Sequence, residues 1–212
     1  MKTEALALAD SDQTRPDEGA KMLARHIAGE PRAFEELVQV FGGSVYGYLA
    51  RAGIQKPAAD DLFQETFLRV HKAARRYDPG HPFRVWLFTI ANNLIRSHFR
   101  KKKVRRIMVG WWKRSGSSDP HADLRPLDPA DDSPGPDEQA QAKSRAQWLK
   151  LAMAELPEGP RRALLLTQVE GLSHEEAAQV LDAPIPTIKT WVRRGRLMLA
   201  EALDKEEKEC NS

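Results

Sequence analysis

The sequence contains a single cysteine, Cys210, which excludes an intramolecular disulfide framework and a cysteine-rich zinc cage. Long apolar runs are also missing: the N-terminal MKTEALALADSDQ is broken by Asp10 and Asp12, and no run approaches the roughly 18 apolar residues of a membrane span. There is no glycine-rich phosphate loop or nucleophile motif, and the six histidines are scattered. We therefore expect a cytoplasmic protein that is not inserted in a membrane, is not an enzyme, and has no metal site and no cofactor.

The 212 residues, 41% of them hydrophobic and 30% charged, suffice for one medium core or two small ones. Apolar residues recur at helical spacing, and no run alternates as a strand would. We expect three N-terminal helices: one from near Pro31, one from near Pro57 to the turn at 77–82, and one from about Phe83 to Arg106. Such helices can close one small core.

A change of composition divides the chain. Residues 119–138 hold five prolines and seven acidic residues against one basic residue, which predicts a flexible acidic linker. Helical patterning resumes near Ala140 and predicts helices over about 140–154, 160–169, 173–181 and 186–203. We therefore predict an all-α fold with two small helical domains. Its parts are an N-terminal extension (1–19), a first domain (20–108), the linker (109–139), a second domain (140–205) and a tail (206–212).

A forty-residue stretch, 79–118, contains ten basic residues and no acid. Such one-sided charge is the electrostatic footprint of a surface that binds a polyanion. Asn92 and Asn93 lie within it, and side-chain amides can read base edges. Two plainer interpretations stay open: a solvated basic helix end, and a core role for the aromatic residues Trp86 and Phe88.

A second motif lies near the C-terminus. Residues 173–176, Ser-His-Glu-Glu, form a capping box that begins a short helix. A turn at 182–185 follows, and then a helix that is basic until Glu201. This order predicts a helix-turn-helix whose second helix enters a major groove. The alternative is a helical hairpin with a basic exterior.

Four segments resemble those of the extracytoplasmic-function (ECF) sigma factors of bacteria: 33–37, 61–67, 86–93 and the C-terminal helix-turn-helix. The likeness covers about residues 20–106 and 140–204. It implies that the first domain is sigma region 2 and the second is sigma region 4. Together they would direct core RNA polymerase to promoters, bind the minus-ten and minus-thirty-five elements, and help to melt the DNA.

The resemblance also implies roles for individual residues and a set of partners. The partners are core RNA polymerase through its β′ and β subunits, promoter DNA, and an anti-sigma factor. Asn93 and the loop 75–83 would capture a flipped base, and Arg196 would contact phosphate. Asp61 can also, or only, cap its helix. The implied residues are Tyr77, His81, Asn93, Arg96, Arg100 and Lys101 at the minus-ten element; Lys189, Thr190, Arg193, Arg194 and Arg196 at the minus-thirty-five element; and Asp61, Gln64, Glu65 and Phe67 on the polymerase.

Departures from the family pattern, at Ser97, Pro186 and Trp191, bear on the promoter sequence rather than on function. Trp111 and Trp112 are hypothesised to anchor the linker while its acids mimic nucleic acid, with an unstructured spacer as the alternative. Two rival functions also remain open. One is a regulator that binds duplex DNA without polymerase, and the other is an interaction adaptor that binds nucleic acid without sequence preference.

Overall fold

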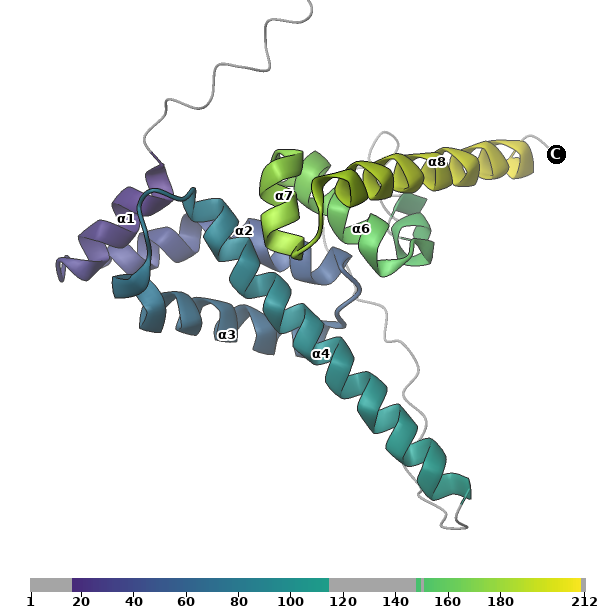
Figure 1. Cartoon of the computed structure of the whole chain (residues 1–212), viewed down its shortest axis with the longest axis horizontal. Coiled ribbons are helices and arrows are strands. Elements are labelled where there is room, and N and C mark those ends of the chain that lie inside the picture. Colours follow the sequence, from purple (N-terminus) through teal and green to yellow (C-terminus); the bar gives the residue numbers. More distant parts are fainter. Residues whose placement is uncertain (1–16, 115–147, 150, 211–212) are drawn as a thin grey trace, which may run out of the picture.

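The computed structural model describes residues 17–114, 148–149 and 151–210, and within these ranges every regular element is helical (Figure 1). The predicted all-α class with two units is therefore confirmed. Most of the predicted linker lies outside the described residues, as do residues 1–16. The N-terminal unit comprises α1 (Glu18–Ile27), α2 (Ala33–Arg51), α3 (Lys56–Ala73), the 3₁₀ turn η1 (Ala74–Arg76) and α4 (Phe83–Arg114). The C-terminal unit comprises a helical stretch at 151–155, α6 (Glu158–Leu164), the π-helical segment η2 (Leu165–Val169), α7 (His174–Leu181) and α8 (Ile185–Cys210).

The core of the N-terminal unit follows the predicted helical spacing. Helix α2 buries Leu37, Phe41 and Val45 against α3 and α4. Helix α1 was not predicted as a helix. Its N-cap is Asp17, whose carboxylate accepts the backbone N–H of Ala20 and also that of Phe83 at the start of α4. The acid thus joins the first helix to the fourth.

Helix α4 is longer than predicted. It continues past Arg106 to Arg114 and projects beyond the N-terminal unit (Figure 1). The extra turns contain no proline, and basic side chains near a helix C-terminus interact favourably with the helix dipole, so nothing in the local sequence ends the helix at Arg106. Trp111 and Trp112 lie in these last turns, and the surroundings of their indoles are outside what the structure describes.

The C-terminal unit confirms the helix-turn-helix. Ser173 and Glu176 form both hydrogen bonds of the capping box at the start of α7. Asp182 ends α7 in the left-handed region at φ 52°, which turns the chain toward α8. Helix α8 begins one residue before Pro186 and runs past the predicted end to Cys210. Pro186 therefore still lies among the first four positions, where a helix needs no N–H donor.

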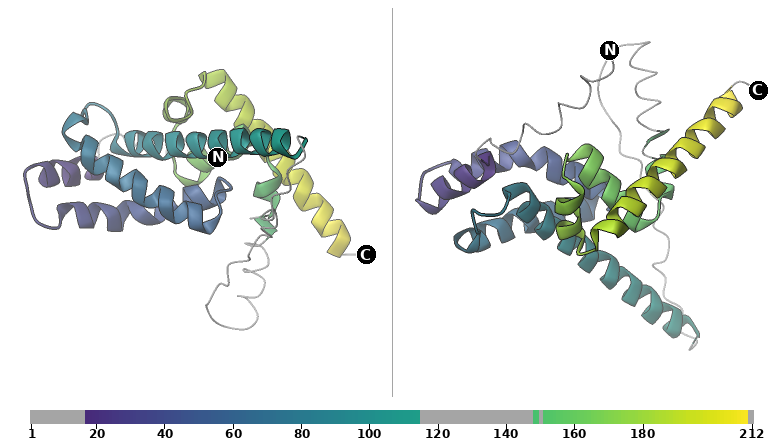
Figure 2. Two further views of the ribbon diagram at one scale, coloured as in Figure 1. Left: turned by 90° about the horizontal axis from the view of Figure 1, so that it is seen from below. Right: turned by 45° about the horizontal axis from the view of Figure 1, so that its top comes forward.

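The two units pack against each other. Helix α7 lies against α4, and η2 lies against α2, so the buried apolar residues of both units form one continuous cluster. Figure 1 and both views of Figure 2 show the C-terminal unit seated on the N-terminal unit. No helix among the described residues is long and apolar enough to cross a membrane.

Candidate nucleic-acid and polymerase interfaces

One exposed face of α4 carries the predicted minus-ten residues of that helix. Asn93, Arg96 and Arg100 are exposed and spaced at i, i+3 and i+7, so they share one side of the helix, and Lys101 is exposed next to them. The Arg96 guanidinium lies 3.5 Å from a carboxylate oxygen of Asp182 in the other unit. Both side chains are about half exposed or more, so this ion pair is weak.

The loop that precedes α4 is held in place by its own hydrogen bonds. The Tyr77 hydroxyl donates to the carbonyl of His81 at 2.5 Å, and a carboxylate oxygen of Asp78 accepts the backbone N–H of Gly80 at 2.9 Å. The other carboxylate oxygen lies 3.2 Å from Nδ1 of His81. Burial, with help from nearby carboxylates, raises the pKa of Tyr77 to about 12, so its hydroxyl stays a donor at neutral pH. The His81 ring remains exposed.

The aromatic residues of the basic stretch divide between core and surface. Phe88 is fully buried, as the core interpretation predicts. Trp86 is half-buried, and its ring packs on Tyr77 and Phe83 with centroids 5.0 and 5.9 Å apart. The indole therefore packs against residues at both ends of the loop at 77–82 and supports it.

Adjacent residues Asn92 and Asn93 have opposite environments. Asn93 is exposed, whereas Asn92 is fully buried between the two units. The Asn92 amide donates to the carbonyl of Val180 at 2.8 Å, and its oxygen accepts from Arg162 at 2.8 Å and from Tyr48 at 3.3 Å. Asn92 is therefore a structural contact in this arrangement, and Asn93 is the amide available to a ligand.

The predicted polymerase-binding residues of α3 form an exposed stripe with one exception. Asp61 and Gln64 are exposed, and half-buried Glu65 pairs with Arg69 at 2.7 Å, which lowers the Glu65 pKa. Phe67 is only 5% exposed, because it packs on other core rings, so it cannot contact a partner directly and supports the stripe instead.

Sequence reasoning missed Leu68, which completes the same face. It is 50% exposed and lies seven residues after Asp61, so its spacing could have revealed it. Helix α3 begins at Lys56 with Gln55 as N-cap, which places Asp61 inside the helix and removes its predicted alternative role as a cap. We call Asp61, Gln64, Glu65 and Leu68 the α3 stripe.

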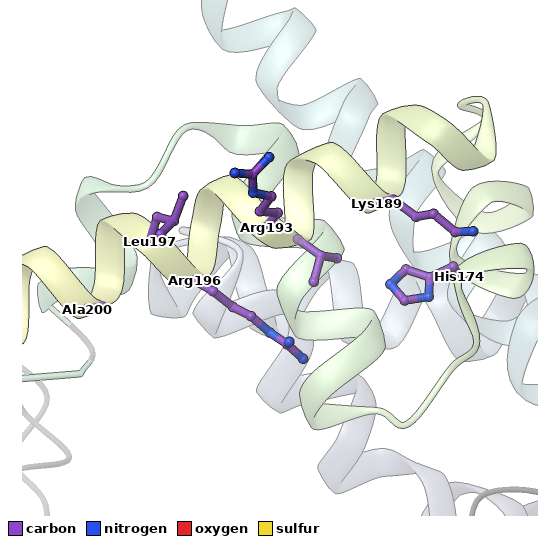
Figure 3. Close-up of a pocket in the computed structure, with 7 residues that line it drawn as sticks. His174, Lys189, Arg193, Arg196, Leu197 and Ala200 are labelled. Atoms are coloured by element: carbon purple, nitrogen blue, oxygen red, sulfur yellow. The ribbon is translucent and has the colours of Figure 1, made fainter. Parts of the chain in front are cut away.

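The five predicted residues of the second DNA site lie exposed on the first half of α8: Lys189, Thr190, Arg193, Arg194 and Arg196. Three of them line a shallow pocket together with His174 of α7 (Figure 3). None of the residues that line it is acidic. His174 follows the helix cap directly and was not predicted here. These side chains form a cationic surface suited to DNA phosphates.

The hydroxyl of Thr190 donates to the carbonyl of Pro186 at 2.9 Å, so its methyl group is the part left for a base contact. Arg196 donates to the side chain of Gln168 at 2.5 Å. Among the residues that the structure describes, no three His, Cys, Asp or Glu side chains gather as metal ligands, although Nε2 of His26 lies 3.0 Å from Nδ1 of His71.

Comparisons with known proteins agree with this division of the chain. The family model of sigma-70 region 2 matches residues 37–105, and that of sigma-70 region 4 matches residues 146–199. These are the two units of the fold. The pair defines a sigma factor of RNA polymerase.

Individual relatives narrow the family. The chain is 31% identical to the RNA polymerase sigma factor CnrH of Cupriavidus metallidurans, over 90% of this chain and 97% of CnrH. It is 30% identical to the ECF sigma factor SigE of Mycolicibacterium smegmatis, over 94% of this chain and 74% of SigE. The structure of CnrH in complex with the cytosolic domain of CnrY matches with a TM-score of 0.62 and 25% identity, covering 90% of this chain and 99% of CnrH. The chain belongs to the ECF RNA polymerase sigma factors.

Membership of this family decides between the functions that the sequence left open. The protein directs RNA polymerase to promoters and initiates transcription, and its role is regulatory. A regulator that works without polymerase and an adaptor without sequence preference are both excluded as its main function.

Proposed function

We propose that the exposed face of α4 and the loop at 77–82 bind the melted minus-ten element, and that α8 reads the duplex minus-thirty-five element. The observation that carries the first assignment is that exposed Asn93 shares a helix face with Arg96 and Arg100. An amide can both donate to and accept from a base edge, while arginines hold the backbone. Unstacking a base costs a few kcal/mol, and binding the flipped base offsets that cost.

On α8, we assign Arg193, Arg194 and Lys189 to base and phosphate contacts in the major groove. The support is their exposure on the second helix of a helix-turn-helix, which presents its N-terminal half to base edges. Arg196 lies farther along the helix and is held by Gln168, which suits a phosphate contact that sets register.

The α3 stripe is our candidate for the surface that binds the β′ subunit of the polymerase, with region 4 contacting β. An apolar side chain surrounded by polar ones is typical of a protein interface, and Leu68 among three polar residues has that arrangement. The protein would act by binding rather than by catalysis, and in the cytoplasm, where polymerase and chromosome meet.

An anti-sigma factor is a further proposed partner. The matching CnrH structure is a complex with CnrY. A second match, with a TM-score of 0.61 and 24% identity over 82% of this chain and 98% of the other, is the sigma factor RpoE of Bartonella quintana with the anti-sigma factor NepR. We infer that a protein of this inhibitory class controls the present chain as well.

Two single substitutions test the assignments against each other. With core polymerase, Asn93→Ala should abolish most promoter opening, measured by permanganate reactivity of unpaired thymines, while duplex binding is largely kept. Arg193→Ala should instead weaken duplex binding at the minus-thirty-five element. Each variant is the control for the other, because both replace an exposed polar side chain. Equal loss of duplex binding in both variants would contradict the division of labour.

A further inference from the structure

Two histidines from different helices face each other at one end of region 2. His26 lies in the last turn of α1, and His71 lies in the last turn of α3. Nε2 of His26 is 3.0 Å from Nδ1 of His71, although 45 residues separate the two along the chain. No short sequence motif contains both residues, so the sequence alone predicts no metal site here.

The short contact between the two rings limits their protonation states. Two N–H groups cannot point at each other, so one of the two facing nitrogens carries a proton and the other offers a lone pair. When that proton moves to the outer nitrogen of its own ring, both facing nitrogens present lone pairs to the gap. Neutral imidazole is the form of histidine that binds metal ions. The pair can therefore become a two-nitrogen chelate by a change of tautomer, without releasing a proton.

The separation of the two nitrogens favours some metal ions over others. Imidazole nitrogens bound to one ion at about 2.0–2.1 Å stand roughly 2.9 Å apart at a right angle and roughly 3.4 Å apart at a tetrahedral angle. The observed 3.0 Å is near the first value. Right-angled nitrogen ligands are typical of Cu(II) and Ni(II), and tetrahedral ligands are typical of Zn(II). Of these ions, Cu(II) also binds such ligands most tightly.

A shared aromatic neighbour holds both imidazoles in place. The Phe34 ring of α2 packs on His26 with centroids 4.8 Å apart and on His71 with centroids 5.3 Å apart. Phe34 packs in turn edge-on against the buried ring of Phe67 at 6.5 Å. The ligands are thus positioned before an ion arrives, which lowers the entropy cost of chelation. Because His71 is exposed, an ion can reach the pair from solvent.

The surrounding charges are compatible with a bound cation. Both histidines lie at helix C-termini, where the last carbonyl groups carry partial negative charge that favours cations. The neighbouring Arg25 is already paired with the carboxylates of Glu30 and Glu36, at 2.6 and 2.7 Å. Lys72 is exposed, so water and salt screen its charge.

We propose that His26 and His71 form a binding site for one divalent transition-metal ion of the Cu(II) class, which joins α1 to α3. Water fills the remaining coordination positions, since within the described part of the chain no third His, Cys, Asp or Glu gathers with the pair. The ion stabilises the docking of α1, the helix whose N-cap Asp17 contacts the start of α4. The site does not depend on the DNA and polymerase assignments made above.

The test uses the full chain with Cys210→Ser, which removes its single thiol as a competing ligand. Cu²⁺ is titrated at about pH 7.5, where histidine is mostly neutral, and followed by calorimetry and electron paramagnetic resonance. We expect one ion per chain, with nitrogen hyperfine splitting from two imidazoles. His26→Gln and His71→Gln should each lower the affinity roughly 10- to 100-fold, because one remaining imidazole cannot chelate. Free Cu²⁺ at about a hundred times the Kd should raise the Tm by roughly 5–10 °C, and both variants should lose this shift.

His98→Gln is the matched control, because His98 is a half-buried histidine of α4 whose ring packs on Phe99. It should leave both the affinity and the Tm shift unchanged. If His26→Gln does not fold, His71→Gln decides, since His71 is exposed. Binding that survives both substitutions, a spectrum with one imidazole, or an equal loss in His98→Gln would overturn the site. Binding only at millimolar Cu²⁺ would also overturn it, because the ion would then be adventitious and the pair a hydrogen bond alone.

Discussion

Replacing Gly19 by alanine should displace α1 from its place against α4 and weaken promoter opening. Gly19 is the second residue of α1, and a Cβ there would lie 2.1 Å from Cδ1 of Phe83 and 2.9 Å from Cζ of Phe41. Both rings are buried and pack on each other with centroids 5.0 Å apart, so neither can retreat. The helix must move instead.

The size of the effect follows from two opposing contributions. Overpacking a well-filled site costs about 1–3 kcal/mol, and replacing glycine by alanine inside a helix gains up to about 1 kcal/mol. The net loss should be about 1–2 kcal/mol, which for a chain of this length lowers the Tm by roughly 2–8 °C. Gly43→Ala in α2 is the control, because no neighbouring atom lies within 4 Å of its Cβ position, and it should raise the Tm.

Moving α1 should also affect promoter opening, because Asp17 connects this helix to the start of α4. Its carboxylate accepts the backbone N–H of Phe83, the first residue of α4, directly after the loop that holds Tyr77 and His81. Gly19→Ala should therefore reduce permanganate reactivity at the minus-ten element, with binding to the minus-thirty-five duplex retained. Thermal unfolding by circular dichroism measures the stability. A Tm change of the same sign for Gly19→Ala and Gly43→Ala would refute the reasoning.

Two further predictions concern charge. Burial raises the pKa of Glu170 above its ordinary value of 4.5, although Arg84, Ser44 and Arg51 favour the ionised form. The stabilising contribution of protonated Glu170 is therefore fully present below that ordinary value and is lost as the pH rises through the raised pKa. Glu170→Gln should stabilise the chain against urea at about pH 8 and have little effect below about pH 4; stabilisation at both would contradict this. Arg196→Ala should lower the slope of log binding constant against log salt concentration by about 1, the amount expected for one phosphate contact, on every promoter sequence tested with holoenzyme. A changed sequence preference would instead assign Arg196 to a base contact.

The features that could be predicted correctly from the sequence are those that a short segment of the chain determines by itself. The helix from near Pro31, the capping box at Ser173 and the turn before α8 each depend on neighbours within a few residues, and the structure confirms all three. Helix α1 also had a local signal, since Asp17 precedes it as a good N-cap, but its ten residues are mostly polar or small. Phe67 lies four residues after Phe63 and three before Val70, so its burial was foreseeable from apolar spacing.

The contact between the domains had no such local signal, and Asn92 shows why. Asn92 and Asn93 have the same chemistry and lie about 100° apart around α4. Which one faces region 4 depends on Arg162 and Val180, which are 70 and 88 residues farther along the chain. Alanine at position 93 should therefore remove a contact with the base, whereas alanine at position 92 should loosen the packing of the two domains against each other. The distance between the domains distinguishes the two variants, because only the change at position 92 should lengthen it.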